Sequence, residues 1–569
     1  MKNFSFTSYL IPLMILFVLL KPNLIFSQGE ANWWYFGQKA GLNFPFSAPT
    51  TVTNGVLWTY EGGASIADAS GNLLFYTSGD TVYNKLHLIM ANGTGLLGDK
   101  SSTQATMIIK RPGSSNIYYI FTNRAGGFPR ELRYSIVDMN LAAGNGSVTV
   151  KNVLLHNSTS EKLNATLACN KKDVWIISHD LNGNGFRTFL LSASGISAPV
   201  LSAVGYSIPG SGWTNQAVGQ LKVSPDGRKI AIGYFSARAE IYDFNRFTGV
   251  VSNPLTIVAS PNFGYYGCEF SPDSKVLYYN GPWSNQITQI DLCAGSNAAI
   301  LSSSVSLIAS TGNQTGGFQL GPDGKIYIAL NCFFAPKFLA VINNPNTLGL
   351  GCNFVNNAIN LSGRNAGLSI PNFPSFYVTP TLTVTIPSFT SITSCATATF
   401  VSPVLSTCSN TNIITSYSWN FGDPGSGPLN TSSLANPVHN YATPGTYSVN
   451  LIVYSPCPDT LKQVITISSA TVNATVQNAN CISPTGSVII NSVTNGVPNY
   501  TLAEASTTLA VGFNTPYTLS NVSVGTHTYV LTSANGCNTT FTAQILPGGS
   551  QPNITATGPV TLNCVPNTT

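Results

Sequence analysis

The sequence LKVSPDGRKIAIGY at residues 221–234 decides the fold because its pattern recurs twice. CEFSPDSKVLYYN at 268–280 and FQLGPDGKIYIAL at 318–330 have the same parts in the same order: an alternating apolar run, a Pro-Asp-Gly or Pro-Asp-Ser turn followed by a basic residue, and a second alternating run. This is the pattern of a β-hairpin. The turn prolines lie 47 and 50 residues apart. That period predicts a four-stranded sheet repeated around an axis, as in a β-propeller.

Three weaker copies of the hairpin precede these, with turns near Gly71, Gly113 and Lys171–Lys172. An alternative is a set of unrelated hairpins in a two-sheet sandwich, but a sandwich does not need the same turn at a fixed period. Dividing the strand-like span from Asn32 to about Thr379 by a period of ~50 residues predicts seven blades, with six as the alternative. Ring closure is expected between NWWYFG at 32–37 and the blade that contains PNFPSFYV at 371–378.

The strand pattern, the charge distribution and the N-terminal segment together predict an all-β, exported protein that does not bind nucleic acid. Charged residues make up only 8% of the chain, against ~25% in ordinary soluble domains. The net charge of +5 is spread without a basic block, so no nucleic-acid footprint is present. Residues 1–28 have the pattern of a secretory signal peptide, with Lys2 before an apolar run. The alternative, an uncleaved membrane anchor, is disfavoured by Pro12 and Lys21, and no transmembrane segment is expected after cleavage.

Residues 382–469 resemble a PKD domain, a small immunoglobulin-like sandwich. The resemblance rests on YSWNFGDPGSG at 417–427 and NPVHNYATPGTYSVNLIV at 436–453, although Pro424 stands where the motif has Gly. It implies that Trp419 is a core residue and that Tyr447 lies near a corner before the closing strand. His439 is expected to be a partly buried ring bonded to a loop carbonyl rather than a metal ligand or base.

Residues 470–548 resemble the repeat modules of bacterial gliding adhesins and predict a further β-sandwich of about seven strands. Residues 549–569 read as the start of another, incomplete module, since ITATGPVTLNC parallels VNATVQNANC at 472–481. We expect this segment to be disordered, Cys564 to lack a partner and the natural chain to continue past Thr569.

Pairing is the default expectation for the eleven cysteines of an exported chain. The predicted disulfides are Cys395–Cys457 and Cys481–Cys537, each closing one sandwich, and Cys332 and Cys352 are further candidates in the last blade. Zinc is not expected, because the chain has no C-x-x-C motif and no histidine near these cysteines.

The propeller region also resembles a family. A set of segments is similar to the N-terminal propeller of surface proteins that gliding bacteria export by the type IX secretion system. The set consists of the three hairpins quoted above, NWWYFGQKAGLNF, GNLLFYTSGDTVYNKLHLIMANGTGLLG, SSNIYYIFTN, LRYSIVDMN and GRNAGLSIPNFP. The resemblance spans residues 29–380. It implies export, surface display and contact with the secretion and gliding machinery, and it implies no catalytic residue.

The sequence contains no catalytic motif and no cofactor motif of full length. DLNGNG at 180–185 copies the first half of a calcium loop, but Leu191 stands where the bidentate Glu belongs, so an Asn-Gly turn is the expectation. The segment with Arg124, Arg130, Glu131 and Arg133 reads as a solvated loop rather than an anion site. Tryptophans can stack on sugars. Of Trp33, Trp34, Trp58, Trp213 and Trp283, the residue Trp213 in PGSGWTN is the preferred ligand-binding candidate.

These observations favour a cell-surface binding or adhesion protein without enzymatic activity. Its propeller would bind an extracellular glycan or surface protein and be carried on a stalk of β-modules. One alternative is a polysaccharide hydrolase or lyase at the propeller mouth, which would need two carboxylates facing one bond. A second is a structural part of the motility or secretion machinery.

Overall fold

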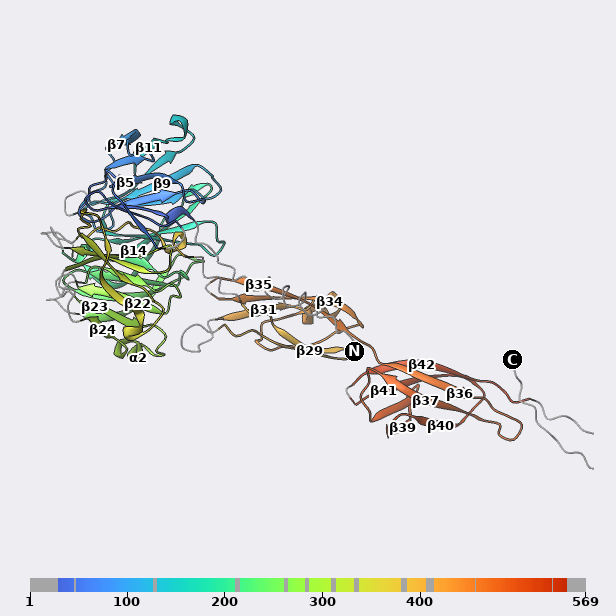
Figure 1. The fold of residues 1–569 in the computed structure, drawn as a ribbon. Coiled ribbons are helices and arrows are strands. Elements are labelled where there is room, and N and C mark those ends of the chain that lie inside the picture. Colours follow the sequence, from blue (N-terminus) through green and yellow to red (C-terminus); the bar gives the residue numbers. More distant parts are fainter. Residues whose placement is uncertain are drawn as a thin grey trace, which may run out of the picture. The chain divides into compact units, whose positions relative to one another are not determined.

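The computed structural model describes most of residues 29–549, namely 29–45, 48–125, 130–209, 215–259, 265–281, 286–308, 314–331, 337–379, 386–405, 414–455, 457–534 and 536–549. The chain forms two compact units that divide near residue 386, and both consist almost entirely of β-strands (Figure 1). Several parts of the chain that were singled out in the sequence lie outside the described residues. They are the predicted signal peptide, the segment 550–569, Trp213, Trp283, Cys332, Cys408 and Cys564.

The first unit is a β-propeller, and six of its blades follow the chain in order; the outer strands of the first two are joined at Ala91 and Ser147 into one eight-stranded sheet. Blade 1 comprises β4 (Ala64–Ala67), β5 (Leu73–Thr77), β6 (Thr81–Asn84) and β7 (Ile89–Thr94). Blade 2 comprises β8 (Thr106–Lys110), β9 (Ile117–Thr122), β10 (Leu132–Asp138) and β11 (Ser147–His156). Blade 3 comprises β12 (Thr159–Leu167), β13 (Val174–Asp180), β14 (Gly183–Ser192), β15 (Gly195–Ile196) and β16 (Val200–Ile208).

The next three blades contain the three hairpins with Pro-Asp turns. Blade 4 comprises β17 (Leu221–Val223), β18 (Lys229–Tyr234), β19 (Arg238–Phe244) and β20 (Val251–Ala259). Blade 5 comprises β21 (Cys268–Phe270), β22 (Val276–Gly281), β23 (Gln286–Asp291) and β24 (Val305–Ile308). Blade 6 comprises β25 (Gln314–Leu320), β26 (Ile326–Asn331), β27 (Phe338–Ile342) and β28 (Phe354–Asn360).

Blade 7 holds the sheet β1 (Trp33–Phe36), β2 (Ala40–Asn43) and β3 (Thr50–Val52). Short helical segments lie in the connections of this unit: η1 (Gly29–Ala31), η2 (Ala142–Gly144), η3 (Asn215–Ala217), α2 (Asn297–Ser302), η4 (Gly349–Cys352) and η5 (Ser375–Tyr377). The described residues therefore contain seven blades, the number that the hairpin period favours.

The turn between the first two strands is the same in blades 1 to 6. Each has a residue in the left-handed region, and these residues are Gly71, Gly113, Lys171, Gly227, Ser274 and Gly324, with φ between 57° and 83°. In blade 4 the Asp226 carboxylate also accepts hydrogen bonds from the Ser224 hydroxyl at 2.6 Å and the Arg228 N–H at 3.1 Å. All six turns that the sequence indicated are thus confirmed, including the two without glycine.

The ring is closed by residues 365–373, which lie between β25 and β4 beside β1. Leu368 O accepts from Gly317 N at 3.1 Å, and Asn372 N donates to Gly63 O at 2.9 Å. Gln38 N donates to Asn365 O at 2.8 Å, next to β1. The predicted closure between the two ends of the propeller is confirmed. Because the innermost segment of blade 7 comes from the far end of the chain, this blade has no inner hairpin turn, which explains why only six turns are visible in the sequence.

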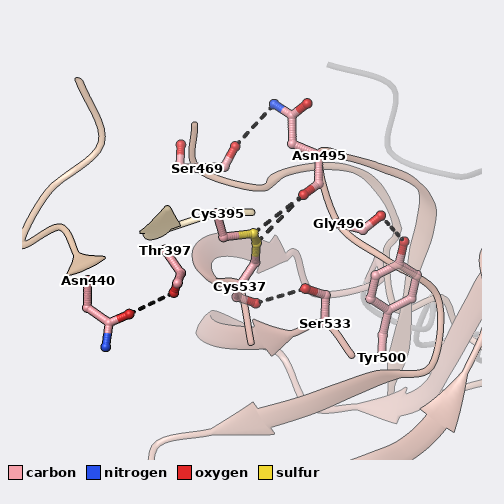
Figure 2. The surroundings of a disulfide bond; sticks show 9 residues. All are labelled: Cys395, Thr397, Asn440, Ser469, Asn495, Gly496, Tyr500, Ser533 and Cys537. Carbon is pink, nitrogen blue, oxygen red and sulfur yellow. Dashed lines mark hydrogen bonds between the residues drawn. A yellow bond between two sulfur atoms is a disulfide. The ribbon is translucent and has the colours of Figure 1, made fainter. Parts of the chain in front are cut away.

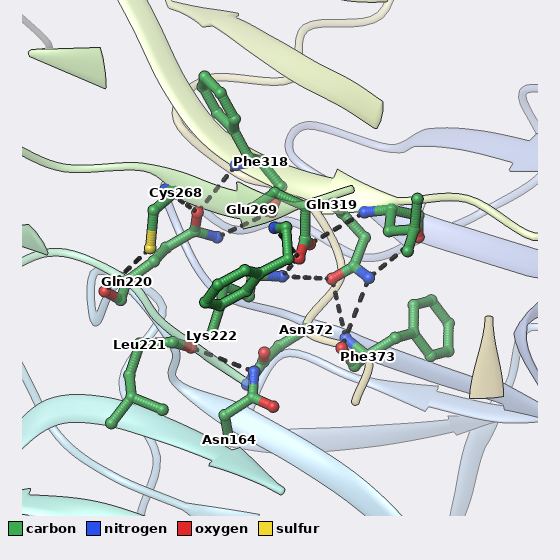
Figure 3. Close-up of polar contacts among 12 residues, drawn as sticks. Asn164, Gln220, Leu221, Lys222, Cys268, Glu269, Phe318, Gln319, Asn372 and Phe373 are labelled. Atoms are coloured by element: carbon green, nitrogen blue, oxygen red, sulfur yellow. Dashed lines mark hydrogen bonds and ion pairs between the residues drawn. The ribbon is translucent and has the colours of Figure 1, made fainter. Parts of the chain in front are cut away.

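Buried amide and charged side chains join the inner strands across the axis (Figure 3). Gln104 Nε2 donates to Leu221 O at 3.0 Å and to Asn372 Oδ1 at 3.1 Å, and Asn372 Nδ2 donates to Leu163 O at 3.0 Å. Lys222 Nζ lies 3.0 Å from Glu269 Oε2 and 2.7 Å from Gln319 Oε1. The closing segment therefore occupies the middle of the ring rather than an edge of it.

The second unit begins with an immunoglobulin-like sandwich. One sheet is formed by β29 (Thr390–Ser394), β30 (Thr397–Val401) and β33 (Val438–Asn440), and the other by β31 (Ser416–Asn420), β32 (Thr431–Ser432), β34 (Gly445–Tyr454) and β35 (Asp459–Ile467), with η7 (Pro424–Asn430) between. Trp419 lies in the core between Phe389 and Phe400, at ring distances of 5.0 and 5.2 Å. Tyr447 Oη donates to Thr443 O at 2.6 Å. The core role implied for Trp419 is confirmed.

The interpretation of His439 needs correction. The ring is buried, stacks on Phe421 at 4.3 Å and contacts a carboxylate, with Nε2 3.2 Å from Asp423 Oδ2. Asp423 also accepts from Ala442 N at 3.1 Å. The partner was missed because it lies sixteen residues away on another loop, and the local sequence around His439 does not reveal it.

A second sandwich follows, with the seven strands that were expected. One sheet contains β36 (Thr471–Gln477), β37 (Gly486–Thr494) and β40 (Tyr517–Val522), and the other β38 (Tyr500–Glu504), β39 (Thr507–Phe513), β41 (Gly525–Thr532) and β42 (Asn538–Ile545). Across the described residues, no helix is long and apolar enough to span a membrane.

The predicted disulfide pairs are wrong. Cys395 is bonded to Cys537, which joins the two sandwiches, and Cys352 is a buried free thiol. Cys457 and Cys481 are each disulfide-bonded, but not in the predicted pairs. Cys395 lies beside the start of β34, and Cys457 follows the end of the same strand. β34 has ten residues, so its two ends lie roughly 30 Å apart at ~3.3 Å per residue. Likewise Cys537 precedes β42, whereas Cys481 lies near its far end, where Ala479 N donates to Leu546 O. Each predicted pair would have had to span the length of a sandwich.

Removing the amide of Asn372 should destabilise the whole ring. In Asn372→Leu the carbonyl of Leu163 and the amide of Gln104 lose a partner in a buried site, which costs about 2 kcal/mol or more. Calorimetry should show a lower midpoint for the propeller transition. Asn157→Leu, at an exposed position between β11 and β12, is the control and should change stability by less than about 0.5 kcal/mol. Equal midpoints for the two variants would contradict the central role of Asn372.

Candidate functional site

The tryptophans singled out in the sequence have different environments. Trp34 is buried in the core, and Trp33 is half-buried and donates from Nε1 to Gly71 O at 3.0 Å. Trp213, the preferred candidate, and Trp283 lie outside the described residues. Trp58 is 39% exposed. Among the tryptophans of the propeller that the structure describes, Trp58 is therefore the one with a large accessible face.

Trp58 forms an exposed aromatic pair with Tyr60. The ring centroids lie 4.6 Å apart with the planes at 70°, and Tyr60 is 53% exposed. The backbone beneath them is fixed, because Tyr60 N and Glu61 N both donate to Lys100 O at 3.1 Å, and Tyr60 O accepts from Leu368 N. The pair belongs to the connection from blade 7 to blade 1 and lies beside the closing segment. Two exposed rings on a rigid backbone form a surface suited to stacking on a ligand.

A polar cluster begins at the next residue and lies where the inner strands of four blades start. It consists of Glu61, Thr103, Glu161, Lys162 and Tyr266. Glu161 Oε2 accepts from Thr103 N at 2.8 Å and lies 2.9 Å from Thr103 Oγ1. Glu61 Oε2 accepts from Tyr266 Oη at 3.0 Å and lies 3.2 Å from the same Thr103 hydroxyl. The two carboxyl groups therefore share one hydroxyl.

This sharing requires a proton on one carboxyl group. The Thr103 hydroxyl carries one hydrogen, and its oxygen already accepts from Gly219 N at 3.1 Å. If it donates to Glu161, then its contact with Glu61 is a hydrogen bond only when Glu61 is protonated. Burial, and next the charge of Glu161, raise the pKa of Glu61; burial also raises the pKa of Glu161. Glu161 is only 1% exposed, whereas Glu61 is partly exposed, so Glu61 is the member that a ligand could reach.

Two buried bases stand behind the carboxyl groups. Lys162 Nζ donates to the carbonyls of Ala217, Val218 and Gly219 at 3.3, 3.0 and 3.3 Å, and burial lowers its pKa to about 7. His179 is also fully buried, and burial lowers its pKa to about 4. Lys162 thus fastens the entry to blade 4 onto the inner strand of blade 3, and its charge favours the ionised form of the neighbouring Glu161.

The other candidate sites take structural roles. Asp180 at the start of DLNGNG lies 2.8 Å from Arg187 Nε and 2.9 Å from His156 Nε2. Burial acts to raise the pKa of Asp180, but the hydrogen bonds from His156 and Arg187 outweigh it and hold the pKa below its ordinary value. The segment forms the hairpin turn between β13 and β14, as expected.

The arginine segment is not a fully solvated loop, as the sequence suggested. Glu131 and Arg133 form an ion pair at 2.7 Å, and Arg130 is buried near the charge of Glu161. Two of the four charged residues, Glu131 and Arg133, therefore pair with each other. A third, Arg130, interacts electrostatically with Glu161 of the polar cluster.

Sequence reasoning missed Tyr60, Glu61 and Glu161. The available signal was local: an aromatic pair and a carboxylate in WTYEGG at 58–63, directly before an apolar run. Glu161 could not be linked to Glu61, because only the ring brings residues one hundred positions apart to the same hydroxyl.

Comparisons with known proteins identify one module of the chain. Residues 383–465 match the family model of the PKD domain, so this module is a PKD domain. No curated protein matches the chain. Many solved structures are similar at a low level, and two examples follow. A putative 6-phosphogluconolactonase from Bacteroides uniformis has 11% identity, a TM-score of 0.34 and coverage of 71% of this chain and 96% of that chain. The β-propeller domain of Cps50 (Swd1) from Myceliophteria thermophila has 8% identity, a TM-score of 0.33 and coverage of 54% and 93%. Neither similarity assigns an activity.

The proton on Glu61 should make stability depend on pH. A carboxyl group whose pKa is raised on folding stabilises the folded state at low pH, and this contribution disappears as pH rises through the folded pKa. Relative to Glu61→Gln, we therefore expect the melting temperature of the unchanged protein to fall as pH rises from about 5 toward 8, because the folded pKa of Glu61 is raised to about 8. His179, whose pKa is lowered to about 4, acts with the opposite sign below about pH 6.5 in both proteins, so its effect cancels in the comparison. Glu61→Gln should reduce this decline, because an amide does not titrate.

The matched control is Asp243→Asn, which removes a partly exposed carboxylate that pairs with Lys229 at 2.6 Å. Its melting temperature should have the pH dependence of the unchanged protein. A Glu61→Gln variant with the full decline would show that Glu61 is ionised in the folded state.

Proposed function

We propose that the chain is an extracellular binding protein whose propeller holds a glycan on the Trp58–Tyr60 pair. The pair itself carries the proposal: two exposed aromatic rings 4.6 Å apart, on a backbone fixed by three hydrogen bonds, beside a partly exposed carboxyl group. Aromatic faces stack on the apolar faces of sugar rings, while Glu61 Oε1, the oxygen that contacts neither Thr103 nor Tyr266, can accept a hydrogen bond from a sugar hydroxyl. The PKD domain and the disulfides fit an extracellular protein.

A glycan is favoured over a protein partner by the surface chemistry. The chain has 8% charged residues, and the site offers rings, hydroxyl groups and one neutral acid rather than a charged patch. Neutral polysaccharides present the same hydroxyl-rich surface. In this proposal the two sandwiches serve as a stalk, and the resemblance to type IX cargo of gliding bacteria supports a place on the cell surface near the gliding machinery. Loss of surface labelling in a strain lacking the type IX apparatus would test that route.

The second candidate, a polysaccharide hydrolase, is favoured by one observation: Glu61 and Glu161 contact the same hydroxyl. Against it, Glu161 is 1% exposed, so only one of the two carboxyl groups can meet a sugar. Incubating the protein with each bound polysaccharide and measuring new reducing ends separates the two functions, and binding alone predicts no release.

Truncating either ring should weaken binding. With the complete chain, Trp58→Ala and Tyr60→Ala should each lower affinity for a polysaccharide identified on a glycan array by about fivefold, since loss of one stacking contact costs on the order of 1 kcal/mol. Both side chains are exposed, so the melting temperature should hardly change. The measurement is an isothermal titration for each variant.

The control is Phe247→Ala, because Phe247 is 63% exposed in the β19–β20 turn of blade 4, away from the pair. Its affinity should equal that of the unchanged protein. If Trp58→Ala and Tyr60→Ala bind as tightly as Phe247→Ala, the site is elsewhere.

A further inference from the structure

We propose that the Cys395–Cys537 disulfide is a mechanical bypass that carries tension around the folded parts of the two sandwiches. Cys395 lies in the turn between β29 and β30, and Cys537 lies in the turn between β41 and β42. The bond therefore joins the start of the PKD domain to the last hairpin of the second sandwich (Figure 2). The inference concerns the stalk and does not depend on what the propeller binds.

The bond closes a large loop. Its ends are 142 residues apart in sequence, but their Cα atoms are 5.5 Å apart. The loop contains β30 to β41, which are all but one strand of each sandwich. When the chain is pulled from before β29 and after β42, the short covalent route runs along β29, across the two sulfur atoms and along β42. The residues of the loop lie outside this route.

The two strands on the route are placed to carry load. β29 is the first strand in the order β29-β30-β33, and β42 is the last in the order β39-β38-β41-β42, so both are edge strands. The crosslink lies directly beyond one end of each of these two strands, and the external force acts at the other end. Tension therefore acts along the strand and does not shear it against the neighbouring strand. A strand is already almost fully extended at ~3.3 Å per residue. Tension can therefore pass without breaking the ladders between β30 and β41.

The crosslink also sets how far the stalk can lengthen. Without it, the loop of 142 residues would enter the stretched chain, and at ~3.6 Å per residue this adds roughly 500 Å. With it, the same residues contribute a few ångströms. The bond is thus predicted to change the stalk from an extensible chain into one of nearly fixed length.

Single-molecule stretching of the complete chain, held at both termini, tests the proposal. The background carries serine at Cys408, Cys457, Cys481 and Cys564, so that in the stalk only Cys395 and Cys537 remain. Adding Cys395→Ser and Cys537→Ser should increase the fully stretched length by roughly 500 Å. This length counts residues outside closed loops, so it remains valid even if a variant folds poorly.

The control adds Cys268→Ser and Cys352→Ser to the same background, which removes two free thiols and should leave the stretched length unchanged. Mass mapping of unreduced peptides from the natural chain should find Cys395 joined to Cys537. Equal stretched lengths with and without Cys395 and Cys537, or these two cysteines recovered as free thiols, would overturn the proposal.

Discussion

The propeller depends on hydrogen-bond partners for the backbone N–H and C=O groups at the place where the inner strands converge. Inner strands of neighbouring blades do not pair with one another, so their N–H and C=O groups cannot all pair in ladders, and the residues there are buried. Unpaired buried polar groups cost about 1–3 kcal/mol each. Side-chain amides fill the gap: Gln104 accepts from Leu163 N and Leu221 N, and Gln220 accepts from Phe318 N at 2.9 Å. Gln104 thus connects blade 2 with blades 3 and 4, and Gln220 connects blade 4 with blade 6.

The closing segment completes this arrangement and links stability to the site. Asn372 bonds to blades 2 and 3, and Phe373 N donates to Gln319 Oε1 of blade 6 at 3.1 Å. The same segment holds Tyr60 through Leu368 N. The buried pair of Lys222 and Glu269 has several further partners, which a desolvated ion pair requires if it is not to be a net cost. The Trp58–Tyr60 pair is therefore hydrogen-bonded through its backbone to the segment that closes the ring.

Burial divides the polar cluster into two roles. Glu161 and Lys162 are buried and hold the starts of blades 2, 3 and 4 together, whereas Glu61 is partly exposed beside the two rings. A neutral acid next to exposed aromatic rings suits a neutral ligand, and this agrees with a chain that carries few charges. In the stalk, by contrast, a covalent bond performs the task that buried amides perform in the propeller, because small sandwiches have less core to stabilise them.

The sequence by itself determined the propeller, its blade number and the two sandwiches, because these follow from local rules. A Pro-Asp-Gly turn between alternating runs makes a hairpin wherever it occurs, and its period counts the blades. Trp419 could be assigned to a core through the resemblance of its segment to the PKD domain. Only the tertiary structure decided which distant residues meet: Glu61 with Glu161 on Thr103, His439 with Asp423, and Cys395 with Cys537. Strand direction was the missing information, since it determines which end of a sandwich each cysteine occupies, and sequence spacing does not contain it.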